Sequence, residues 1–80
     1  MVFEKVSDQE RYLVLINPTS HGHDYRFHQG WFPRYIGAQL MFWSDGQWKE
    51  WKDETSEPKH IETKVFVPPY GMVLLREKRG

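Results

Sequence analysis

The chain contains no cysteine, which excludes disulfide bonds and cysteine-ligated metal sites. It also lacks net charge, because 11 basic side chains balance 11 acidic ones, so no basic field is available to attract nucleic acid. No apolar run approaches the roughly 20 residues that a membrane-spanning helix needs. We therefore expect a cytoplasmic protein without a cofactor, for which neither nucleic acid nor a membrane is a partner.

Helical spacing of apolar residues is absent from every segment of useful length, and short apolar or alternating runs stand between turn signals instead. Strands are expected at residues 2–7, 12–16, 24–28, 40–44, 47–51, 61–67 and 72–75. Eighty residues correspond to one domain, spanning 1–80. The pattern predicts an all-β fold, an antiparallel β-sandwich of about seven short strands of Greek-key type.

Three local features refine this fold. Residues 12–16 form a continuous apolar run, which is typical of a central strand buried on both faces. Residues 29–37 contain several aromatic side chains between glycine and proline, and we expect this connection to pack under the sheet. Near the end of the chain, Pro68 and Pro69 are expected to set a turn that Tyr70 caps, with Gly71 supplying its permissive φ.

The strongest short-range signal is Asp45-Gly46, which stands between two runs rich in aromatic residues. This dipeptide favours a two-residue hairpin loop, because both central residues of a type I′ turn need positive φ. The expected register then pairs Trp43 with Trp48 and Leu40 with Trp51. Alternation places the side chains on two faces, Leu40, Phe42 and Trp51 on one and Met41, Trp43 and Trp48 on the other.

One face of this hairpin would then be left for solvent or a partner. Flat indole rings can pack on the apolar CH faces of sugars, so Trp43 and Trp48 are candidate carbohydrate-binding residues. Gln47 and Glu50 are candidates for contacts with sugar hydroxyl groups. The alternative is that the same rings are buried, either beneath residues 31–36 or against another protein domain.

A cluster of histidines raises two further possibilities. His21, His23 and His28 stand near Asp24, and zinc accepts both residue types, but the spacing fits no strong metal-binding template. Ser20, His23 and Asp24 are the residue types of a hydrolase triad, but no nucleophile elbow accompanies them. We therefore expect neither a metal site nor a catalytic residue here.

Three segments together resemble a known family. They are YLVLINPTSHGHDYRF (12–27), FWSDGQWKEW (42–51) and KVFVPPYGMVLLRE (64–77). Their order and spacing are similar to those of the C-terminal all-β domain of the α-amylase superfamily, glycoside hydrolase family 13. The 1,4-α-glucan (glycogen) branching enzymes look most similar. The matching pieces are a buried strand ending in Asn17, the Tyr25-Arg26 strand, Ser44-Asp45, and the Pro-Pro turn before a last apolar strand.

The resemblance implies a non-catalytic domain that supports the catalytic (β/α)₈ barrel of a larger enzyme acting on starch or glycogen. Tyr25 would then be a core residue and Arg26 a paired residue at the rim. Eighty residues cannot form a barrel of typically ~250 residues, so catalysis is expected outside this chain. The barrel is the expected partner, and α-glucan is a further candidate ligand. Two alternatives stay open, a free-standing carbohydrate-binding module and a small β-domain for protein interaction.

Overall fold

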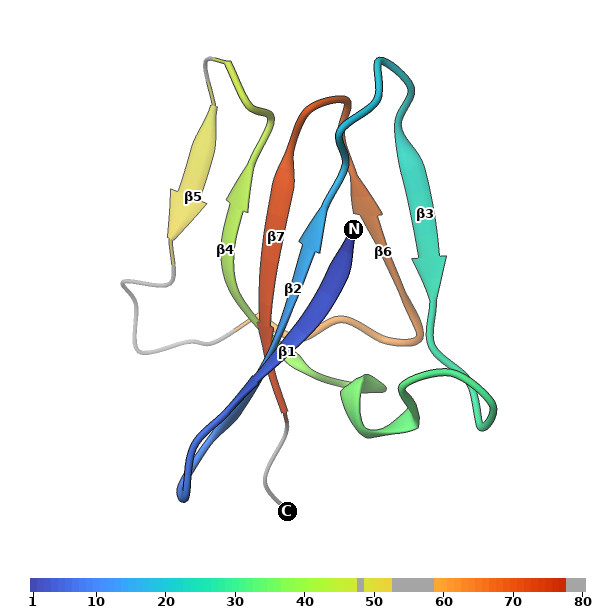
Figure 1. The fold of residues 1–80 in the computed structure, drawn as a ribbon, viewed down its shortest axis with the longest axis vertical. Coiled ribbons are helices and arrows are strands. Elements are labelled where there is room, and N and C mark those ends of the chain that lie inside the picture. Colours follow the sequence, from blue (N-terminus) through green and yellow to red (C-terminus); the bar gives the residue numbers. More distant parts are fainter. Residues whose placement is uncertain (48, 53–58, 78–80) are drawn as a thin grey trace.

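Two antiparallel sheets make up the structure, a computed structural model that describes residues 1–47, 49–52 and 59–77 (Figure 1). The described residues form the strands β1 (Val2–Val6), β2 (Arg11–Ile16), β3 (His23–Arg26), β4 (Gln39–Ser44), β5 (Glu50–Lys52), β6 (Lys64–Val67) and β7 (Met72–Arg76). A single 3₁₀ turn, η1 (Pro33–Tyr35), lies between β3 and β4. The prediction of an antiparallel all-β fold with about seven short strands is confirmed within this described part of the chain.

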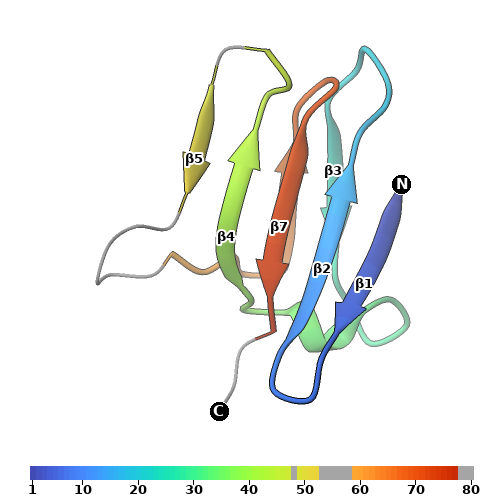
Figure 2. The ribbon, with the colours of Figure 1, turned by 60° about the vertical axis from the view of Figure 1, so that its left-hand side comes forward.

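The larger sheet has the order β1-β2-β7-β4-β5, and β3 pairs with β6 in a separate two-stranded sheet. The last strand of the chain, β7, therefore lies at the centre of the larger sheet, between β2 and β4 (Figure 2). The smaller sheet and η1 lie behind the larger sheet in this view, so they cover only one of its faces.

The core lies between these two layers. Alternate residues of the central strands point into it, because successive side chains of a strand point to opposite faces. Its buried members are Leu13, Leu15, Phe27, Tyr35, Ala38, Val65, Val67, Val73 and Leu75. Full burial of one such large apolar side chain contributes about 1.5–3 kcal/mol.

The prediction that β2 is a central strand is confirmed, since β2 lies between β1 and β7. The expectation that it is buried on both faces is wrong. Leu13 and Leu15 are fully buried, but Tyr12, Val14 and Ile16 are only half-buried. The reason is that no second layer of the described chain covers the outer face of the larger sheet.

The aromatic connection packs under the sheet as predicted. Trp31 returns to His28 through a pair of backbone hydrogen bonds, and its ring stacks on Phe27 with centroids 5.3 Å apart. Tyr35 is fully buried, and its hydroxyl donates a hydrogen bond to Glu4 Oε2 at 3.0 Å. Burial and, to a smaller extent, the neighbouring Glu4 carboxylate raise the pKa of the Tyr35 hydroxyl well above its ordinary value.

Strand β3 contains Tyr25 and Arg26, which were expected to be a core residue and a paired residue at the rim. Tyr25 is half-buried and packs against the core, while its ring stacks on Trp31. Arg26 is exposed and lies opposite Lys64 on β6. Among the described residues Arg26 forms no ion pair, so the expected pairing at the rim is not found.

Candidate functional site

The hairpin of β4 and β5 has a longer loop than the sequence predicted. Trp43 pairs with Trp51 and Ser44 with Glu50, which leaves residues 45–49 as the loop. Asp45 closes this loop: its backbone N–H donates to the Lys49 carbonyl at 3.0 Å, and its Oδ1 accepts the N–H groups of Gln47 and Lys49, both at 2.9 Å. The predicted two-residue type I′ turn is therefore wrong, because the Asp45 carboxylate organises a wider loop and, among the described residues of this loop, only Gly46 has positive φ.

The two faces of the hairpin also differ from the prediction. A register shift lies between Leu40 and Phe42, so Met41 interrupts the simple alternation along β4. Leu40 and Trp43 consequently both pack against the core, and Phe42 lies on the outer face. Trp48 lies outside the described residues. Since the partner of Trp43 is Trp51 and Trp43 faces the core, the predicted platform of Trp43 paired with Trp48 is not formed in that register.

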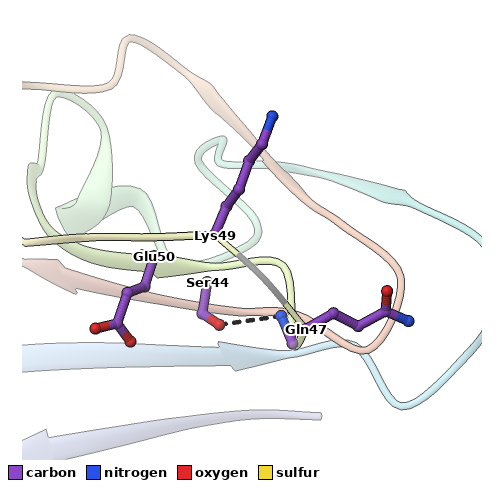
Figure 3. A pocket seen from close by; sticks show the side chains of 5 residues that line it. Ser44, Gln47, Lys49 and Glu50 are labelled. Atoms are coloured by element: carbon purple, nitrogen blue, oxygen red, sulfur yellow. Dashed lines mark hydrogen bonds between the residues drawn. The ribbon is translucent and has the colours of Figure 1, made fainter.

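The two predicted polar residues lie beside the same hollow. Gln47 and Glu50 line an open depression of about 380 Å³ at the β4–β5 loop, together with Ser44, Gly46 and Lys49 (Figure 3). The Gly46 N–H donates to Ser44 Oγ at 3.0 Å and fixes the floor of the loop. Figure 3 shows that the polar ends of Gln47, Lys49 and Glu50 point in different directions from this floor. The hollow is thus a polar surface whose side chains do not point toward one common position.

The turn between β6 and β7 contacts this loop through its backbone. Gly71 N–H donates to the Pro68 carbonyl at 2.9 Å, and Tyr70 occupies the third turn position with φ 56°. The prediction that Gly71 supplies the positive φ is wrong, because Tyr70 does so. Gly71 is required for a different reason: a Cβ there would lie 2.4 Å from the Ser44 carbonyl oxygen. A Cβ on Gly46 would likewise lie 2.2 Å from the Tyr70 carbonyl oxygen.

Asn17 binds a third loop to the same end of the molecule. This side chain is 3% exposed, and its amide nitrogen donates to the carbonyls of His21, Val67 and Pro68 at 2.7, 3.2 and 3.2 Å. Its Oδ1 accepts from the Thr19 N–H at 3.0 Å and from the Thr19 hydroxyl at 2.6 Å. The loops that follow β2, β4 and β6 are therefore joined at one end of the fold, at the top of Figure 1. We call this part of the molecule, residues 17–21, 44–47 and 68–71, the loop end.

The outer face of the larger sheet carries a second candidate site. Phe3, Val14, Leu74 and Phe42 lie directly opposite one another on β1, β2, β7 and β4, so they form one continuous apolar row across four strands. We call these four residues the outer row. Phe3 is 47% exposed and the other three are half-buried. Sequence reasoning missed this surface, although its signal was present in the two continuous apolar runs of β2 and β7.

The histidine-rich loop forms no chemical centre in the described part of the chain. No group of three or more His, Asp or Glu residues there could hold a metal ion. His23 contacts the edge of the Tyr25 ring at a centroid distance of 4.6 Å. No hydrogen bond joins His23 to Ser20 or Asp24 in this part, so a triad is not assembled.

No helix of the described residues is long and apolar enough to cross a membrane. Comparison with family models, with curated proteins and with solved structures gave no match.

Proposed function

We propose that this chain is a non-catalytic β-sandwich domain that docks through the outer row onto another protein domain. The observation that carries the proposal is the continuous apolar row Phe3–Val14–Leu74–Phe42 on a sheet face that no described element covers. The partner is the (β/α)₈ barrel of an α-glucan-active enzyme of branching or α-amylase type, which is the partner that the family resemblance implies.

The chemistry of this face favours a protein partner. Contiguous exposed apolar surface, bordered by polar groups, is typical of protein interaction sites. The row ends at Lys52 on β5, and one of its two neighbouring rows contains Lys5 and Arg76, so charged groups border the apolar centre on these two sides. A domain of this size buries only about 60% of its unfolded surface, so covering the row adds to a small core.

The absence of cysteine permits a direct test by thiol labelling. Phe3→Cys and Phe42→Cys place a thiol in the outer row, and Lys64→Cys places one on the exposed side of β6 as a control. Each variant is labelled with a maleimide, alone and in the presence of the barrel encoded in the same reading frame. We expect the barrel to slow labelling at both outer-row positions and to leave the control unchanged.

Two results would refute this proposal in separate ways. Equal labelling rates with and without the barrel would refute docking through the outer row. A reading frame that encodes no barrel of this superfamily would refute the proposed partner. Slow labelling that develops in the isolated chain as its concentration rises would instead identify a second copy as the occupant.

A further inference from the structure

Tyr70 is held in a backbone conformation that its side chain does not favour. Its φ of 56° occurs at the third position of the turn, where glycine or asparagine is the usual residue. The side chain is nevertheless 56% exposed, and in the described part of the chain it makes no hydrogen bond or ring contact. The fold therefore presents an aromatic ring to solvent at an energetic cost, and such strain is most often found at ligand sites.

The backbone of Tyr70 and its Cβ lie close to Gly46, at the edge of the hollow of the β4–β5 loop. A Cβ built on Gly46 would lie 3.3 Å from the Tyr70 Cβ, and Gly46 itself lines the hollow. The aromatic side chain therefore starts near the edge of the polar depression that Gln47 and Glu50 line.

The lining of the hollow favours a neutral ligand with many hydroxyl groups. Lys49 and Glu50 contribute opposite charges, so neither an anion nor a cation is preferred overall. Ser44 and Gln47 provide both donors and acceptors. An apolar ring next to such a mixed polar lining matches a sugar, which has an apolar CH face and a hydroxyl periphery. The volume lies in the range of small-molecule sites, although the hollow is open.

In the described part of the chain, the rings around Trp31 pack on one another. Tyr25 and Phe27 stack on Trp31, with centroid separations of 5.8 and 5.3 Å and interplanar angles of 11° and 17°. These rings therefore cover one another's faces. Trp51 has the Lys59 ammonium group 5.2 Å from its ring centroid.

We propose that the loop end binds a neutral oligosaccharide, with Tyr70 stacking on a sugar ring and Gln47 and Glu50 contacting its hydroxyl groups. This inference goes beyond the proposed function, because it concerns the loop end and not the outer row. Hydrogen bonds hold the backbone on both sides of the site: Tyr70 N–H donates to the Thr19 carbonyl at 3.0 Å, and Asp45 Oδ1 accepts the N–H groups of Gln47 and Lys49 in the opposite loop.

The test is an NMR titration of the isolated chain with maltoheptaose and, separately, cellohexaose, each up to about 10 mM to cover weak binding. We expect amide shifts at residues 44–47 and 69–71 with at least one of the two sugars. Tyr70→Gly should weaken this binding about two- to tenfold, a change of the size expected for one aromatic contact. Tyr70→Phe, which keeps the ring, should retain it.

Two features of the design separate lost binding from lost folding. Glycine favours positive φ, so Tyr70→Gly removes the ring without adding strain. Phe66→Ala removes another exposed ring, on β6, and should leave the affinity unchanged. Absence of shifts with both sugars, or equal affinity of Tyr70→Gly and the parent chain, would overturn the proposal. Because no barrel is present, the result is independent of docking through the outer row.

Discussion

Asn17→Asp replaces the side-chain NH₂ group of Asn17 by an oxygen atom, in a side chain that makes several hydrogen bonds within the loop end. The amide nitrogen of Asn17 faces three carbonyl oxygens, those of His21, Val67 and Pro68, in a site that is 3% exposed. The introduced carboxyl group would place an acceptor oxygen against these three acceptors. The bonds from Thr19 to Oδ1 can persist, so the substitution tests the donor side alone.

The expected cost is about 3–5 kcal/mol at neutral pH, from two lost N–H donors, buried carbonyls without partners and a buried charge. This compares with a total stability of roughly 4–12 kcal/mol for a chain of this length. Burial and the facing carbonyls raise the pKa of the introduced carboxyl above its ordinary value of about 3.9. The folded state therefore binds its proton more tightly than the unfolded state. Relative to the parent chain, the variant is most stable below about pH 4 and loses stability as the pH rises.

Urea unfolding at pH 4 and pH 7, followed by tryptophan fluorescence, measures this difference. Gln29→Glu is the matched control, because it makes the same amide-to-carboxyl change at an exposed position in the turn before Trp31. We expect the control to follow the parent chain at both pH values. A loss below about 1 kcal/mol for Asn17→Asp at pH 7, or a loss that does not grow between pH 4 and pH 7, would refute the reasoning.

Three further substitutions examine the same end of the fold and the core. Gly71→Ala should lower the free energy of unfolding in urea by about 2–4 kcal/mol, because the new methyl group meets a backbone carbonyl. Gly22→Ala should lower it by under about 1 kcal/mol, because its methyl group meets only the end of an exposed ring. Similar losses for the two variants would contradict this explanation. Tyr70→Gly should be more stable than Tyr70→Ala by about 0.5–1 kcal/mol, since only glycine tolerates the positive φ, and equal stabilities would argue against strain. The Tyr35 hydroxyl has a raised pKa in the folded state, so above about pH 10 this tyrosine ionises more readily in the unfolded state and stability falls. Tyr35→Phe should therefore lose less stability than the parent chain above this pH. Identical alkaline unfolding profiles would contradict that assignment.

Strand positions could be predicted because they depend on local patterns. The apolar run at residues 12–16 and the alternation around Tyr25 mark strands in any tertiary context, and the structure has strands at both. The hairpin register depends on more than the Asp-Gly signal. The Asp45 carboxylate can either accompany a tight turn or accept the backbone N–H groups of a longer loop, and local propensity does not decide between these options.

The candidate site was only partly predictable for similar reasons. Gln47 and Glu50 both line the hollow beside the hairpin loop, and their contact with sugar hydroxyl groups stays a prediction. The predicted position of Trp43 on the face away from the core is wrong, because the register shift at Met41 turns this side chain toward the core. Tyr70 could not be identified, since the need for glycine at position 71 arises from a carbonyl of β4 that is distant in sequence. The continuous apolar run of β2 likewise does not show whether a second layer packs against the outer face of the strand.

The central position of β7 has a consequence for the order in which the molecule folds. β7 is the last strand along the chain, yet it lies between β2 and β4 and forms hydrogen bonds with both. Leu13 and Leu75, which face each other in the sheet, come from opposite ends of the sequence. Pairing of such distant segments slows folding, because a long loop must close first. During synthesis the hairpins β1–β2 and β4–β5 must therefore remain separate, with open edges, until residues 72–76 have left the ribosome.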